Sequence, residues 1–98
     1  MSDYQLINNK EKKRYEFQID EHIAVIEYIK SAKGEVFLTH TQVPSELEGK
    51  GIGSSLVLKV LQDIEKQGLR VVPLCPFVAA YIKRHPEWKK LVSEGINI

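Results

Sequence analysis

The sequence predicts an α+β fold in which an antiparallel meander of strands leads into one βαβ unit and short carboxy-terminal helices. Three observations predict it. Apolar and polar residues alternate along residues 14–20, the hydrophobic period lengthens to about 3.6 residues after Pro44 and Ser45, and a short apolar segment, residues 69–74, follows. A strand, a helix and a strand in this order predict a right-handed crossover between parallel strands.

The first two strands are expected to form a hairpin. Residues 4–8 are a short apolar segment, and residues 9–12 are polar and predict a turn. Along residues 14–20, the apolar side chains fall on one side of the expected strand, and they are Tyr15, Phe17 and Ile19.

The next two strands continue the meander. Residues 22–31 are rich in Ile, Val and Tyr, and the turn Ala32-Lys33-Gly34 follows, with a glycine available for positive φ. Residues 35–43 are apolar on both faces through Val36, Phe37 and Leu38, which favours a central strand.

An amphipathic helix is predicted after the loop at Pro44 and Ser45. At about 100° per residue, six apolar side chains fall on one half of this helix: Ile52, Leu56, Val57, Val60, Leu61 and Ile64. Gly68 stands where a helix commonly ends. After the fifth strand at residues 69–74, residues 76–84 and 87–92 predict short helices, interrupted by His85-Pro86.

Composition excludes several classes of protein. Fourteen Lys and Arg against thirteen Asp and Glu give a net charge of +1, so no nucleic-acid partner is expected. No apolar segment approaches the roughly 20 residues that span a bilayer. One cysteine excludes an internal disulfide, and Met1-Ser2-Asp3-Tyr4 lacks a signal-peptide pattern, so a cytoplasmic protein without a membrane partner is expected. The length of 98 residues predicts a single domain over residues 1–98.

Three glycines separate the loop from the amphipathic helix, in the segment Glu48-Gly49-Lys50-Gly51-Ile52-Gly53-Ser54. Glycine lets the backbone turn sharply and approach a ligand closely. The first N–H groups of a helix lack intrahelical partners and carry partial positive charge, so this segment is expected to bind an anion. The spacing fits neither a P-loop nor a Rossmann fingerprint. A purely structural turn, with Gly53 serving helix packing, stays open.

Two chemically active side chains are expected beside this segment. Cys75 precedes Pro76, a favoured first helical residue, and a thiol at a helix N-terminus has a lowered pKa. His40 lies near the carboxyl end of the preceding parallel strand, where ligands gather in such sheets. Both are therefore expected at one crevice. Each also has a purely structural interpretation. Cys75 would then be a buried, inert cysteine, and His40 a hydrogen-bonded histidine without a chemical role.

Pro73 gives a further geometric expectation. It has no N–H to donate to a neighbouring strand, and it lies within the predicted fifth strand. We therefore expect the two parallel strands to diverge near Pro73, which would leave room for a thin ligand.

These residues resemble the GNAT acetyltransferase superfamily, and more closely its small single-domain YjdJ-type branch, over nearly the whole chain. Gly51 and Gly53 match the Arg/Gln-x-x-Gly-x-Gly/Ala pattern that binds the pyrophosphate of coenzyme A, with Glu48 at the Arg/Gln position. A carboxylate repels a pyrophosphate, so the Glu48 side chain is expected to point away while backbone N–H groups bind. The other matching segments are Pro73-Leu74-Cys75-Pro76-Phe77-Val78-Ala79-Ala80-Tyr81-Ile82 and His85-Pro86-Glu87.

The resemblance implies an N-acetyltransferase that moves an acetyl group from acetyl-coenzyme A to an amine, without a metal ion. It implies that His40 and Cys75 are active-site residues. His40 would accept the proton of the amine, and Cys75 would either protonate the departing thiolate or accept the acetyl group first. The expected coenzyme-binding residues are Val43, Glu48, Gly49, Lys50, Gly51, Ile52, Gly53, Ser54 and Tyr81.

Other functions stay open at this point. The same fold would suit a non-catalytic acyl-coenzyme A binding module, and a structural glycine segment would suit a protein-interaction domain. Tyr81 either lines the coenzyme channel or is a packed aromatic residue. A small amine, a protein N-terminus and a lysine side chain are all compatible acceptors, and a chain of this size is compatible with a monomer.

Overall fold

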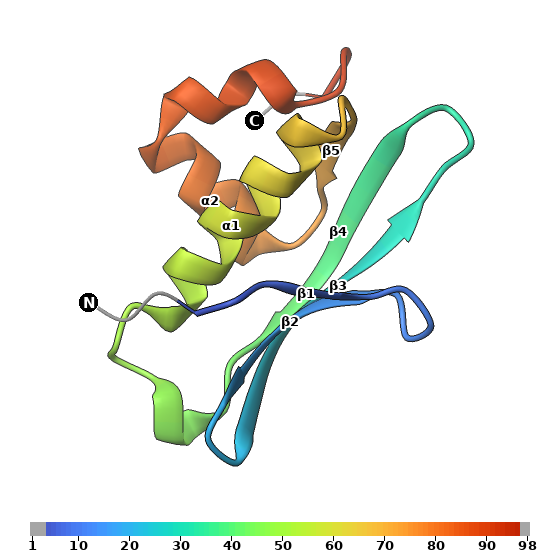
Figure 1. Cartoon of the computed structure of the whole chain (residues 1–98). Helices are drawn as coiled ribbons and strands as arrows, with labels where there is room; N and C mark the ends of the chain where they lie inside the picture. Colours follow the sequence, from blue (N-terminus) through green and yellow to red (C-terminus); the bar gives the residue numbers. More distant parts are fainter. Residues whose placement is uncertain (1–3, 97–98) are drawn as a thin grey trace.

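The chain folds into one five-stranded sheet with its helices on a single face. Figure 1 shows the computed structural model, which describes residues 4–96. Met1, Ser2 and Asp3, which entered the signal-peptide expectation, lie outside the described residues. Strands follow the chain order β1-β2-β3-β4-β5 across the sheet, the first four antiparallel and the fifth parallel to the fourth. The predicted α+β architecture, a meander followed by a βαβ unit, is confirmed.

The meander consists of four strands, and their bounds are β1 (Ile7–Asn9), β2 (Arg14–Ile19), β3 (His22–Lys30) and β4 (Glu35–Gln42). The first strand begins later than the predicted residues 4–8. Tyr4 lies outside the sheet, and its ring packs on Phe17 with 5.5 Å between the ring centroids.

The connection from β4 to β5 contains the main helix. A 3-10 turn, η1 (Ser45–Leu47), precedes α1 (Ile52–Lys66), and β5 (Arg70–Pro73) follows. All six apolar residues predicted for one half of α1 are buried. Gly68 adopts φ +72° just after the helix, which is the left-handed conformation that commonly ends helices. The chain then forms α2 (Pro76–Arg84) and a second 3-10 helix, η2 (Pro86–Leu91).

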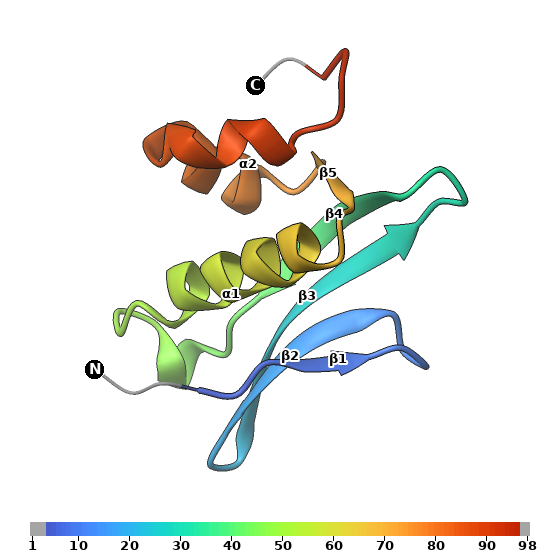
Figure 2. The same cartoon turned by 45° about the horizontal axis from the view of Figure 1, so that its top comes forward.

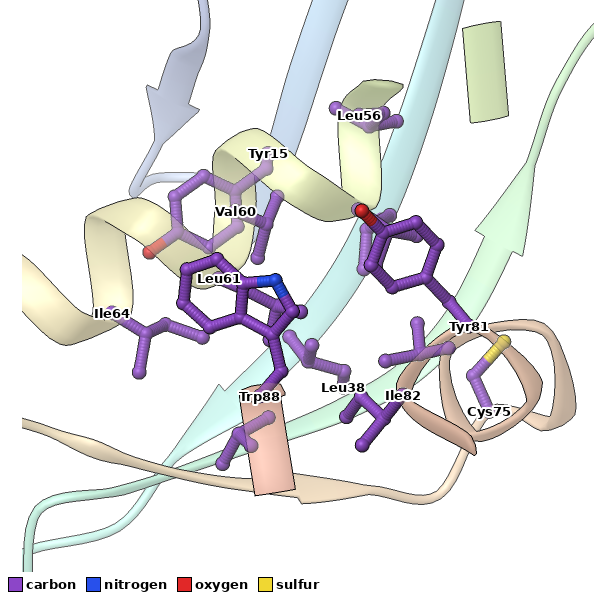
Figure 3. Packing of buried hydrophobic residues seen from close by; sticks show 14 of the residues in the cluster. Tyr15, Leu38, Leu56, Val60, Leu61, Ile64, Cys75, Tyr81, Ile82 and Trp88 are labelled. Carbon is purple, nitrogen blue, oxygen red and sulfur yellow. The ribbon is translucent and has the colours of Figure 1, made fainter. Parts of the chain in front are cut away.

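The hydrophobic core lies between the sheet and its helices. Both views place α1, α2 and η2 on the same face of the sheet (Figure 1 and Figure 2). Figure 3 shows Leu61 of α1, Leu38 of β4 and Trp88 of η2 converging in this layer. No helix within residues 4–96 covers the opposite face, and none is long and apolar enough to cross a membrane.

The helix-free face carries a buried carboxylate. Glu16 is only 2% exposed, and its carboxylate accepts hydrogen bonds from Arg14 (2.6 Å), Asn9 (3.1 Å) and Gln18 (3.3 Å). Burial opposes ionisation, but these hydrogen bonds outweigh it and lower the pKa of the Glu16 carboxyl. Glu16 and Arg14 therefore form a fixed ion pair on this face.

The segment after η2 returns to the sheet. Val92 forms a parallel bridge with Val71 of β5, and the Ser93 N–H donates to the Val71 carbonyl at 2.9 Å. The Ser93 hydroxyl donates to the Glu35 carboxylate at the start of β4. This short pairing was not expected from the sequence, because only two residues beyond η2 take part.

The packing of α1 on the sheet can be tested by truncating Leu61, which has no exposed surface. Leu61→Ala should lower the free energy of unfolding by about 2–5 kcal/mol, because it removes buried methyl groups and leaves a cavity. Urea unfolding followed by Trp88 fluorescence measures this. Ile29→Ala is the matched control: Ile29 is 58% exposed, so its change should stay within about 0.5 kcal/mol. Equal losses in both variants would contradict this assignment of the core.

Candidate active site

A cavity of about 670 Å³ opens where β4 ends and α1 and α2 begin. Its volume lies within the roughly 300–1,000 Å³ that is usual for small-molecule sites. The residues that line it are His40, Thr41, Gln42, Val43, Leu47, Glu48, Gly49, Gly51, Ile52, Gly53, Ser54 and Phe77. The predicted coenzyme-binding residues are thus gathered at one cavity, except Lys50 and Tyr81.

The three glycines have different structural roles. Gly49 and Gly51 adopt φ +79° and +74°, a left-handed conformation that disfavours other residues, although a side chain there would meet no atom within 4 Å. Gly53 has no such backbone requirement. A Cβ on Gly53 would lie 2.8 Å from Cζ of Phe77 and 3.5 Å from Val43, so any other residue there would displace the exposed Phe77 ring that packs on Gly53 at the cavity wall.

The start of α1 faces this cavity without a cap. Gly51 is the N-cap residue, and among residues 4–96 no side chain forms a capping hydrogen bond with the helix start. Ile52, Gly53 and Ser54 are the first three helical residues, and all three line the cavity. Backbone N–H groups at this position lack intrahelical acceptors and carry partial positive charge, so an anionic group in the cavity would be stabilised.

The parallel pairing of β4 and β5 ends beside the cavity. Leu38 and Pro73 are the last paired residues, and the Cys75 N–H then donates to the Leu38 carbonyl at 2.9 Å. Beyond this hydrogen bond the chain turns into α2, whereas β4 continues to Gln42. The divergence expected from Pro73 is present, and within residues 4–96 no strand lies beside the last part of β4 on that side, where Cys75 approaches Thr41 instead.

A β-bulge sets the direction of the side chains in this part of β4. Leu38 pairs with Tyr28 and His40 pairs with Glu27, so Thr39 is an extra residue in β4. Residues directly opposite each other in an antiparallel pair lie on the same face. Thr41 pairs with Ile26, which is fully buried in the core, so Thr41 faces the helices and His40 faces the helix-free side.

Cys75 lies on the helix side, buried at the start of α2 with 4% of its surface exposed. Its sulfur is 3.3 Å from the Thr41 hydroxyl. Burial opposes ionisation, but the Thr41 hydroxyl and the backbone N–H groups of Val78, Phe77 and Thr41 outweigh it and lower the pKa of the thiol. The direction is the one expected from a position at a helix N-terminus.

His40 and Cys75 therefore approach the end of β4 from opposite faces of the sheet. His40 is exposed and lines the cavity. Cys75 lies on the helix side and is hydrogen-bonded to Thr41, the residue that follows His40. The expectation that both line one crevice is therefore not met, because His40 lines the cavity and the buried Cys75 does not. A group lying in the gap beside β4 would meet the imidazole from one side and the sulfur from the other.

Two residues of the predicted set lie elsewhere. Tyr81 is only 5% exposed, and Figure 3 shows its ring directed from α2 toward α1 within the core. It packs on His85 with 4.2 Å between ring centroids, and burial raises the pKa of its phenol. Lys50 is exposed, and it is not among the residues that line the cavity.

The sequence did not single out Thr41 and Phe77. Thr41 is the hydroxyl partner of Cys75, and Phe77 forms the cavity wall opposite Gly53. Phe77 had one available signal, since it occupies the first turn of the helix that follows Cys75. Within residues 4–96, no group of three or more His, Cys, Asp or Glu side chains is arranged to hold a metal ion.

Comparisons with known proteins give a family and a fold. A family profile described as GCN5-related N-acetyl-transferase matches residues 14–91. Protein NATD1 of Xenopus tropicalis is 27% identical over 82 residues, and that of Gallus gallus is 28% identical over 82; each match covers 78% of this chain and 73% of the relative. An NMR solution structure from Staphylococcus aureus, described as GCN5-like, has a TM-score of 0.71 at 22% identity, with 95% of this chain and 91% of that chain covered. This structural similarity shows that the two chains share a fold.

Replacing Thr41 tests how the cysteine is activated. Thr41→Val keeps the shape of the side chain but removes the hydroxyl beside the sulfur, so the pKa of Cys75 should rise and less thiolate should remain near neutral pH. Ultraviolet absorbance of the thiolate, followed as a function of pH, measures this shift. Thr39→Val is the control because the Thr39 hydroxyl binds the Glu27 carbonyl instead. An unchanged titration in Thr41→Val would contradict the assignment.

Proposed function

The chain belongs to the GCN5-related N-acetyltransferase family, and we propose that it transfers the acetyl group of acetyl-coenzyme A to an amine. The observation that carries the proposal is the uncapped start of α1 at a ligand-sized cavity that also reaches His40. The start of α1 provides an anion site for the phosphates of coenzyme A, and His40 provides a proton acceptor for the amine.

The fit of the coenzyme rests on the backbone of residues 49–54. The N–H groups at the start of α1 would bind the pyrophosphate, and the left-handed Gly49 and Gly51 shape the loop around it. Glu48 lines the same cavity and is exposed. Its carboxylate is expected to point toward solvent, because a negative charge would repel the phosphates.

The gap between β4 and β5 would hold the narrower, reactive part of the coenzyme. On the β5 side, no strand within residues 4–96 lies beside residues 39–42 of β4. The Thr41 N–H is directed at the Cys75 sulfur, and backbone groups beside it that face the gap would bind an extended chain. A thioester in this gap would lie between the imidazole of His40 and the sulfur of Cys75. Backbone N–H groups aimed at its carbonyl would stabilise the oxyanion of the transition state.

His40 and Cys75 would divide the proton transfers between them. An amine with a pKa of about 10.4 must lose a proton before it attacks, and an imidazole is the side chain best suited to accept one near neutral pH. Cys75, with its lowered pKa, would either protonate the departing thiolate or carry the acetyl group as a thioester before transfer. Mass spectrometry of the protein mixed with acetyl-coenzyme A alone separates these two roles.

The proposal predicts that binding and turnover separate in site variants. His40→Gln and Cys75→Ala should bind acetyl-coenzyme A within about threefold of the wild type, because neither side chain belongs to the anion site at α1. Turnover should fall about 100- to 10,000-fold in His40→Gln. Calorimetry measures binding, and release of the coenzyme A thiol with a panel of primary amines measures turnover.

The same experiment separates the competing interpretations. Binding without turnover by the wild type would favour a non-catalytic acyl-coenzyme A module, and no heat at millimolar ligand would leave the glycine segment a structural turn. His85→Gln serves as the matched control, since His85 lies at the carboxyl end of α2 and does not line the cavity. It should retain both binding and turnover.

A further inference from the structure

The helix-free face of the sheet presents a row of polar residues that leads to His40. Arg14 of β2 lies directly opposite Glu27 of β3, and Glu27 lies directly opposite His40 of β4. Cross-strand neighbours of this kind have Cβ atoms about 4.5–5.5 Å apart on one face. The Glu27 carboxylate therefore stands beside the imidazole, on a face that no helix within residues 4–96 covers.

The carboxylate of Glu27 is not engaged in the fold. Its cross-strand neighbour Arg14 is held by Glu16, with 2.6 Å between Nε and the carboxylate oxygen. The Thr39 hydroxyl donates to the backbone carbonyl of Glu27 at 3.3 Å and does not engage the carboxylate. Among the described residues, the exposed Glu27 side chain has no hydrogen bond and no ion pair. A charged group is thus available one strand away from the predicted proton acceptor.

We infer that the acceptor is a cationic primary amine that binds on the helix-free face, with its ammonium group held by the Glu27 carboxylate beside His40. This inference rests on the proposed function, because it assigns the second substrate of the same site. The coenzyme would reach the gap from the cavity at α1, and the acceptor would reach it from the other face of the sheet. The β-bulge is what turns His40 toward the acceptor side.

The transfer step needs only these residues and solvent. The ammonium bound at Glu27 gives one proton to the imidazole of His40 and becomes a neutral amine. Its lone pair forms the new N–C bond to the acetyl carbonyl carbon, and the C–S bond of the thioester breaks. After the attack the nitrogen carries a positive charge and loses its second proton to solvent. The coenzyme leaves as a thiolate and takes up one proton, either from Cys75, which solvent then reprotonates, or directly from solvent. Glu27 touches the substrate but exchanges no proton.

The arrangement also predicts which amines are excluded. A carboxylate on the acceptor close to its amine would face Glu27 and be repelled, whereas neutral or additional cationic groups would be accepted. No helix within residues 4–96 covers this face, and Glu27 and His40 are both exposed, so a large substituent on the amine would be tolerated. The selection is thus by charge near the amine and not by size.

Binding of n-butylammonium to the ¹⁵N-labelled protein tests the inference without requiring turnover. In the wild type, amide shifts should saturate at Glu27, Thr39 and His40, and n-butanol, which has the same shape without the charge, should cause none. Glu27→Gln should weaken the binding of n-butylammonium about tenfold or more, because it replaces a charge-assisted hydrogen bond by a neutral one. Glu11→Gln makes the same charge change at the exposed β1–β2 turn and should bind as the wild type does.

Turnover gives the second readout and separates the two proposals. At about pH 7.5, n-butylamine is protonated and aniline is neutral, so Glu27→Gln should lower kcat/KM about 10- to 100-fold for n-butylamine and less than about threefold for aniline. Equal losses for both amines, or unchanged n-butylammonium binding in Glu27→Gln, would overturn the ammonium site. Binding of n-butylammonium at Glu27 without acetyl transfer to any amine would support the site and refute the acetyltransferase proposal.

Discussion

The early end of the pairing between β4 and β5 is the constraint on which the rest of the site depends. Pro73 has no N–H, and after the Cys75 N–H binds the Leu38 carbonyl the two chains part. This parting leaves the end of β4 open, places Cys75 at the start of α2 and lets α1 begin beside the same gap. Had the pairing continued, a strand would occupy the space in which the cavity now lies.

The parts of the fold that were predictable are those set by local pattern. The apolar residues of α1 repeat at a helical period, and all six are buried in the structure. Pro76 at the start of α2 and Gly68 after α1 fix helix ends through their own backbone preferences, whatever surrounds them. The gathering of Gly49, Gly51 and Gly53 at one cavity could be predicted for the same reason, since they adjoin one helix start.

The parts that the sequence left open depend on neighbours far away in the chain. Simple alternation from Leu38 would put His40 toward the helices, but Thr39 is an extra residue against β3 and reverses that direction. From the sequence alone, the aromatic side chain of Tyr81 suits either a channel wall or the core. The packing of α2 on α1 is what buries it in the core. Register and packing are cooperative, so no single segment reveals them.

The return of the chain to β5 limits the addition of strands from other molecules at that edge of the sheet. β5 is only four residues long, and its outer backbone groups would otherwise offer a template on which a second molecule could add a strand. The bridge of Val92 to Val71, secured by Ser93 and Glu35, occupies part of that template. At the other margin of the sheet, β1 is three residues long. Both margins are thus poor starting points for intermolecular sheet growth and aggregation.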